Sequence, residues 1–250
     1  PVGNFFSDIT QLGRTRGEIE RLKATNEKLQ KELIDRKNAD AELAKLKSVL
    51  DLAGTAKYKV VNAKVISLGS TSSFSQTITI DAGTNDGVRQ NMTVITGLGL
   101  VGVVKISYPN SALVQLATDP AFKVGARVAG SQQIGILSGQ GTSKAVLQLL
   151  DNQTTLKVGD VILARGSVNN RPFVPGVPIG QVTAVDNAAG AVTQTADVKL
   201  YVNFSALSTV AVVVSAPKDD PRDALVPRAP VPTPVPTVTI YAQPSESPAP

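Results

Sequence analysis

The chain has 250 residues, of which 42% are hydrophobic and 18% are charged, as is typical of a folded globular protein. It contains neither cysteine nor histidine, which excludes disulfides, thiol nucleophiles, Cys/His zinc sites and Ser-His-Asp triads. The net charge is +5, but the basic residues form no run or stripe of the kind that binds DNA. We therefore expect no nucleic-acid partner and no cofactor.

Residues 8–52 are highly charged, lack proline and repeat their apolar residues every seven positions. This rhythm predicts one long helix that associates with a partner, because a helix so polar outside one stripe does not stand alone. Arg36 and Asp40 interrupt the stripe, which then resumes in a shifted phase. The residues predicted to mediate self-association, in a homodimer or a higher homo-oligomer, are Leu12, Ile19, Leu22, Asn26, Leu29, Leu33, Leu43, Leu46 and Leu50.

Asn26 is the polar residue in this stripe. At an a position of a parallel dimer, a lone Asn pairs with its mate and fixes the register at some cost in stability. The alternative is that the helix lies on its own β domain and that Asn26 is only hydrated. The sequence leaves both interpretations open.

Residues 58–215 are rich in Val, Ile, Thr and Gly and poor in charge. Runs of β-branched residues separated by Gly, Asn, Asp and Pro predict about twelve short strands. The predicted fold class is mainly β with a long N-terminal α-helix: a coiled coil, then two small β-barrels or sandwiches. We expect the first barrel at 58–118 and the second at 119–215, unless the two are interleaved, with one inserted between strands of the other.

A faint internal repeat relates two predicted hairpins, at 86–104 and 158–182. In each, a turn with Gly and Asp precedes a strand, and a second turn feeds a strand that begins with a Gly. Glycines at strand starts often mark bulges or barrel corners. The glycines predicted to shape these turns are Gly83, Gly87, Gly99, Gly102, Gly159 and Gly180.

Residues 216–250 hold most of the 16 prolines. The alternating prolines of 229–236 prevent both helix and sheet ladder and favour an extended polyproline conformation. We therefore predict a disordered Pro-rich tail, in which the mixed-charge cluster 219–223 is flexible.

Two motifs could carry chemistry. Residues 97–102 match G-x-G-x-x-G, but a dinucleotide site needs a helix after the motif, and 103–106 resemble a strand, so we predict a hairpin turn. A Ser-Lys hydrolase would need a serine beside a buried lysine. We interpret Lys105, Lys123 and Lys144 as solvated strand charges, and we expect no catalytic and no metal-binding residues.

A series of short motifs follows the leucine stripe in a characteristic order: 46–52, 63–66, 80–83, 86–88, 92–94, 99–102, 158–161 and 177–182. Together they resemble the rod-shape-determining MreC family over about 9–215. The chain departs from the family pattern at 164–166 and in a longer approach to Gly180.

The resemblance implies a protein anchored in the cell membrane by a helix that precedes this chain, with the coiled coil and barrels on the periplasmic or cell-wall side. It implies a non-enzymatic scaffold of the cell-elongation machinery that organises and activates peptidoglycan synthases to set cell shape. The implied partners are a penicillin-binding transpeptidase, MreD, MreB and a SEDS-type glycosyltransferase.

Two other functions are compatible with some of these features. A periplasmic adaptor of an efflux or secretion system also joins a coiled coil to β domains, but it usually carries a helical hairpin between β segments. The Ser-Lys hydrolase is the third class. The single N-terminal helix favours the scaffold.

Overall fold

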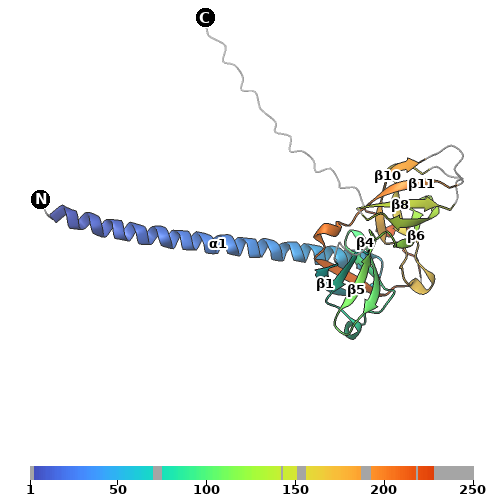
Figure 1. Cartoon of the computed structure of the whole chain (residues 1–250), viewed down its shortest axis with the longest axis horizontal. Helices are drawn as coiled ribbons and strands as arrows, with labels where there is room; N and C mark the ends of the chain where they lie inside the picture. Colours follow the sequence, from blue (N-terminus) through green and yellow to red (C-terminus); the bar gives the residue numbers. More distant parts are fainter. Residues whose placement is uncertain are drawn as a thin grey trace, which may run out of the picture.

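The computed structural model describes residues 3–69, 75–141, 143–150, 156–186, 193–217 and 219–227, with the backbone alone for 3–19. Within these residues one long helix, α1 (Gly3–Thr55), precedes twelve strands and four short 3-10 helices. α1 projects far beyond the strands, so the molecule is a rod with a head at one end (Figure 1). The head consists of two closed six-stranded antiparallel barrels, which confirms the predicted fold class.

The first barrel closes in the strand order β1-β12-β3-β4-β5-β2. β-Branched residues fill its interior, because alternate side chains of each strand point inward. The core includes Ile78, Ile80, Val94, Val104, Val114 and Val212, all fully buried. The strands are β1 (Lys59–Leu68), β2 (Thr77–Ile80), β3 (Thr93–Thr96), β4 (Gly99–Ser107), β5 (Ala112–Leu116) and β12 (Thr209–Ser215), and the 3-10 helix η1 (Thr84–Asp86) lies between β2 and β3.

The second barrel closes in the order β10-β11-β8-β7-β6-β9. Its core includes Leu137, Leu147, Ile162 and Val198, together with an edge-to-face pair of Phe122 and Phe173 whose ring centroids are 5.4 Å apart. The strands are β6 (Lys123–Val128), β7 (Ile134–Gly139), β8 (Lys144–Leu149), β9 (Val161–Ala164), β10 (Pro178–Asp186) and β11 (Thr195–Leu200). The 3-10 helices η2 (Val168–Asn170) and η3 (Phe204–Ala206) lie in the loops after β9 and β11.

β12 belongs to the first barrel. The expectation that the second barrel extends to residue 215 is therefore wrong, and its last strand is β11. β12 pairs with β1 on one side and with β3 on the other. Without it, both of those strands would have an open edge, which a closed barrel avoids. The second barrel is therefore inserted between β5 and β12 of the first.

The two barrels share one strand-pairing pattern, in circularly permuted order. Strands β1 to β5 correspond to β7 to β11, and β12, the last strand of the first barrel, corresponds to β6, the first of the second. The hairpins β3–β4 and β9–β10, which contain the sequence repeat, occupy equivalent places. Gly102 of β4 and Gly180 of β10 are also equivalent. A Cβ atom added to Gly102 would lie 1.9 Å from the carbonyl oxygen of Gln115, and one added to Gly180 would lie 2.3 Å from the carbonyl oxygen of Lys199.

Strands β3, β4 and β12 are buried on both faces. One face lines the first barrel, and the other face, with Ile95, Leu100 and Val213, joins a second core that also contains Val49 of α1 and the interior of the second barrel. This explains why Val210–Val213 shows no alternation of polar and apolar residues, since a strand covered on both faces needs none.

Asp119 connects the two barrels at the β5–β6 link. Its carboxylate is fully buried and accepts hydrogen bonds from the Gln76 N–H (2.6 Å), the Ala121 N–H (2.7 Å) and the Gln115 side-chain amide (3.0 Å). Burial raises the pKa of Asp119, but these hydrogen bonds outweigh it and bring the pKa below its usual value. Asp119 thus joins the first barrel to the start of the second.

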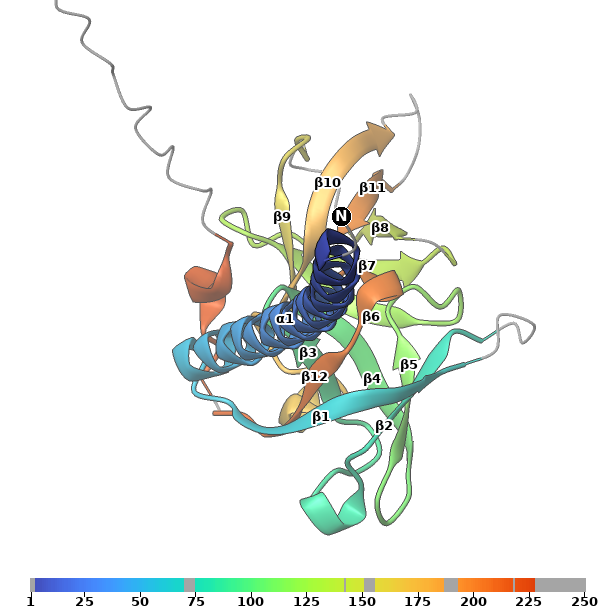
Figure 2. The same cartoon turned by 90° about the vertical axis from the view of Figure 1, so that its left-hand side faces the viewer.

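After β12 the structure describes residues 216–217 and 219–227, and the last of these ranges includes a 3-10 helix, which corrects the prediction of disorder from 216 onward. A short 3-10 helix, η4 (Arg222–Leu225), lies beside the C-terminal end of α1 (Figure 2). Tertiary contacts order this Asp- and Pro-rich stretch, and local composition could not reveal them. The remaining tail, 228–250, lies outside the described residues.

Candidate interaction surfaces

The leucine stripe of α1 is exposed in the single chain. The predicted residues Leu22, Leu29, Leu33, Leu43 and Leu50 have exposed fractions of 48–69%, Asn26 is exposed, and Leu46 is half-buried. The side chains of Leu12 and Ile19 lie outside the described residues. A row of exposed leucines on an isolated helix is costly in water and is typical of a surface that a second helix covers.

A different side of α1 holds the barrels. Val49 and Ala53 of α1, and Ala56 just after it, are buried against the head. Lys45 donates a 2.9 Å hydrogen bond to the Ser208 hydroxyl, and α1 contacts β12, β3 and β1. At about 100° per residue, this side and the stripe of Leu22, Leu29 and Leu33 lie on roughly opposite sides of a straight helix. A partner helix could therefore cover the stripe without meeting the barrels of its own chain.

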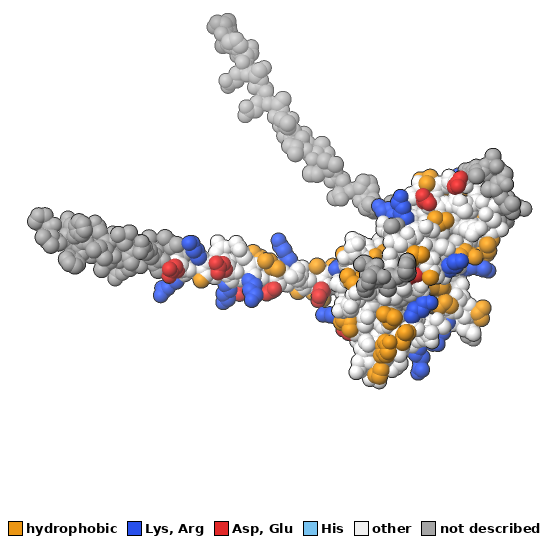
Figure 3. Space-filling model, viewed as in Figure 1, with side chains coloured by type: hydrophobic (Ala, Val, Ile, Leu, Met, Phe, Trp, Pro, Cys, Tyr) orange, Lys and Arg blue, Asp and Glu red, His pale blue; other side chains and the backbone are white. Residues whose placement is uncertain are grey.

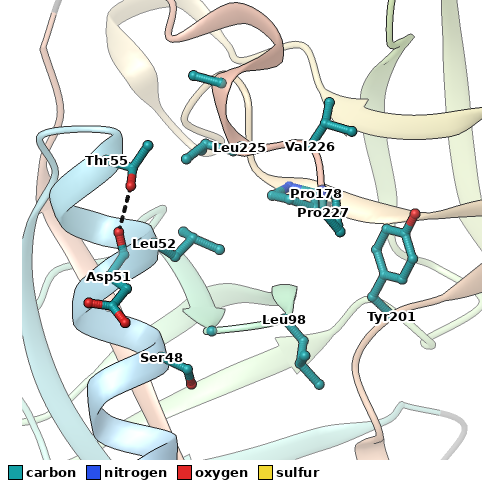
Figure 4. A pocket seen from close by; sticks show the side chains of 12 residues that line it. Ser48, Asp51, Leu52, Thr55, Leu98, Pro178, Tyr201, Leu225, Val226 and Pro227 are labelled. Atoms are coloured by element: carbon teal, nitrogen blue, oxygen red, sulfur yellow. Dashed lines mark hydrogen bonds between the residues drawn. The ribbon is translucent and has the colours of Figure 1, made fainter. Parts of the chain in front are cut away.

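A hollow of about 400 Å³ lies where α1, both barrels and the C-terminal segment meet. Asp51 and Leu52 of α1 line one side, and Tyr201 lines the opposite side (Figure 4). Leu98, at the β3–β4 turn, is exposed beside it, and burial raises the pKa of Tyr201. The hollow is mainly apolar and brings no pair of reactive groups together.

An apolar patch lies on the outer wall of the first barrel. We define the barrel patch as Ile66, Leu68, Ile106 and Tyr108, whose exposed fractions are 45–60%. β2 and β5 connect the two halves of the patch, because β1 pairs with β2, β2 with β5 and β5 with β4. Hydrophobic side chains gather on this barrel in Figure 3. Such exposed apolar groups typically mark a protein-interaction surface.

The described residues offer no recognisable catalytic set. Lys45 and Ser208 meet, but Lys45 is exposed to solvent, and its ammonium group donates a hydrogen bond to the hydroxyl of the half-buried Ser208. Lys105, Lys123 and Lys144 are exposed as well. No group of three or more His, Cys, Asp or Glu side chains in the described part of the chain could hold a metal. Within the motif at 97–102, residues 97 and 98 form the β3–β4 turn and residues 99–102 are the start of β4, so a strand and not a helix follows the turn.

The six glycines expected at turns lie at several kinds of position. Gly83 and Gly87 flank η1, and Gly87 and Gly159 have left-handed φ angles of +86° and +99°, which glycine adopts without strain. Gly99 begins β4, while Gly102 and Gly180 lie within strands, where a neighbouring backbone approaches too closely for a side chain.

The family "Rod shape-determining protein MreC, barrel core" matches residues 65–214. The chain belongs to the MreC family. The cell shape-determining protein MreC of Listeria monocytogenes is 30% identical over 221 residues, which cover 85% of this chain and 73% of that protein. Membership in the MreC family makes this chain a non-enzymatic cell-shape protein.

Solved MreC structures share the fold. The Listeria monocytogenes structure has a TM-score of 0.56 and 30% identity, covering 74% of this chain and 93% of that one. The major periplasmic domain of the cell shape-determining filament MreC has a TM-score of 0.54 and 30% identity, covering 62% and 95%. Among the described residues, no helix combines the length and apolarity needed to span a bilayer.

Proposed function

We propose that this chain is the extracytoplasmic part of a membrane-anchored scaffold of the cell-elongation machinery. In this proposal α1 brings copies of the chain together, and the barrels hold peptidoglycan synthases by contact. The observation that supports it best is the exposed row of Leu22, Leu29 and Leu33 on α1, on the side away from the barrels. A helix paired through this stripe leaves the outer walls of both barrels accessible to other proteins.

We assign the barrel patch to a penicillin-binding transpeptidase. The patch combines aliphatic side chains with the aromatic ring of Tyr108, a mixture typical of interface cores. Lys64 and Lys105 are exposed on the same strands, which favours a partner whose apolar contact is surrounded by acidic residues. MreD, MreB and a SEDS-type glycosyltransferase are further partners proposed from the family resemblance.

The proposal is tested by binding of a purified wall transpeptidase to immobilised protein. Ile106→Glu combined with Leu68→Glu should weaken binding at least tenfold, since each change places a charge in an apolar contact. Ile136→Glu, on the second barrel, is the matched control because Ile136 is similarly exposed. Equal binding by all three proteins would remove the barrel patch from the proposal.

The adaptor alternative has less support. An adaptor's helical hairpin would lie between β segments, whereas in the described part of the chain the α-helix precedes every strand. The hydrolase alternative is incompatible with a non-enzymatic family.

A further inference from the structure

The segment that follows β12 connects α1 to the second barrel. We define the strap as residues 219–227; it follows the family's barrel core, which ends at 214. Leu225 of the strap is 7% exposed and lies in the core that contains Val49 and Ala53 of α1. Val226 and Pro227 line the 400 Å³ hollow between α1 and the two barrels, on the side opposite α1 (Figure 4).

A buried arginine of the second barrel holds the strap. Arg127 of β6 is 3% exposed, and its Nη1 atom donates to Asp223 Oδ1 at 2.6 Å, while its Nη2 atom lies 3.5 Å from Asp220 Oδ1. Asp223 also accepts hydrogen bonds from the Gly130 N–H (3.0 Å) and from the Gln132 side-chain amide (3.3 and 3.4 Å). Both oxygens of Asp223 are thus engaged by the second barrel.

Loss of the two carboxylates would leave a buried charge unpaired. A guanidinium taken out of water is costly unless carboxylates and further hydrogen bonds replace its hydration. Both carboxylates that pair with Arg127 come from the strap. Burial raises the pKa of Asp223, but hydrogen bonds from Arg127, Gly130 and Gln132 and the charge of Arg127 bring it below its usual value. The ion pair is therefore kept at neutral pH.

The direct contacts of α1 are mainly with the first barrel, through β12, β3 and β1, and with η4 of the strap. A second link lies close by: the Tyr58 hydroxyl, just after α1, donates to the Pro175 carbonyl of the second barrel. We propose that the strap is a conformational lock that fixes the direction of α1 relative to the second barrel. Arg127 anchors the lock, and its release widens the range of directions that the rod takes relative to the second barrel.

The test measures a distance across the lock. Because the chain has no cysteine, cysteines introduced at Lys37 on α1 and Lys123 on β6 carry a unique spin-label pair. The labelled protein is mixed with an excess of unlabelled protein. Each oligomer then contains at most one labelled chain, and all measured distances lie within that chain. The lock predicts one narrow distance distribution for the otherwise unchanged chain and a clearly broader one for Asp223→Ala. Amide exchange around Val49 and Ala53 should accelerate at least tenfold in that variant.

Two further variants complete the design. Asp219→Asn removes one charge from an exposed strap residue and should leave distances and exchange unchanged. The double variant Asp220→Asn, Asp223→Asn preserves the shape of both side chains, so it gives a readout even if Asp223→Ala unfolds the second barrel. A narrow, unshifted distribution with unchanged exchange in the double variant would overturn the lock.

Discussion

Replacing Leu22, Leu29 and Leu33 together by glutamine should abolish self-association while leaving both barrels folded. Burying a leucine is worth at least about 1.5 kcal/mol, and 1.4 kcal/mol changes a dissociation constant tenfold. The three changes, which are present in both chains of a homodimer, should therefore weaken association by at least about a thousandfold. Glutamine preserves helix propensity, so the loss would come from the interface and not from a melted helix. Sedimentation velocity over a range of protein concentrations measures the effect.

The matched control is Ile34→Gln. Ile34 is 59% exposed on α1, like the three leucines, but it lies outside their stripe. The substitution Ile34→Gln should leave the sedimentation coefficient unchanged. An unchanged oligomer in the triple variant, or equal loss in the control, would show that the stripe is not the contact between chains.

Replacing Asp119 by alanine should cost about 3 kcal/mol of unfolding free energy, because three hydrogen-bond donors lose their acceptor and each unpaired donor costs at least about 1 kcal/mol. The change leaves the backbone N–H groups of Gln76 and Ala121 and the buried Gln115 amide without this acceptor. It also detaches the start of the second barrel from β2 and β5. Urea unfolding at pH 7 measures the loss, with Asp197→Ala, at an exposed position on β11, as the control expected to cost under about 0.5 kcal/mol.

The same substitution should reduce the acid sensitivity of the protein. The folded-state pKa of Asp119 lies below its usual value, so its stabilisation is complete above the unfolded pKa of about 3.9 and is lost as the pH falls through the folded value. The difference in unfolding free energy between the unchanged chain and Asp119→Ala should therefore be full above about pH 5 and should shrink as the pH falls through about 4 towards 2. A difference independent of pH would mean that the carboxylate charge does not contribute.

Local sequence patterns predicted the elements well, because strands and helices leave periodic signatures. The heptads of α1 and the β-branched runs between Gly, Asn and Asp turns fall where the structure has a helix and strands. Heptad phase could not show that Val49 and Ala53 face the chain's own barrels, whereas Leu50 does not. That depends on contacts between residues distant in sequence.

Long-range pairing accounts for what the sequence did not reveal. The run Val210–Val213 indicates a strand but not its neighbours, so its place in the first barrel required the closed sheet. The Asp- and Pro-rich cluster at 219–223 has the composition of a flexible linker, and only the buried guanidinium of Arg127 explains its order. The Asp119–Pro120 dipeptide likewise predicts a turn, not a junction between barrels.

The central claim is that the protein works by holding other proteins through its rod and barrels. Co-purification of the full-length protein from membranes, with and without Ile106→Glu and Leu68→Glu, tests it most directly. We expect a wall transpeptidase to be enriched with the unchanged protein and lost with the barrel variant, while the variant still self-associates. Recovery of the unchanged protein as a monomer with no peptidoglycan synthase attached would contradict the claim.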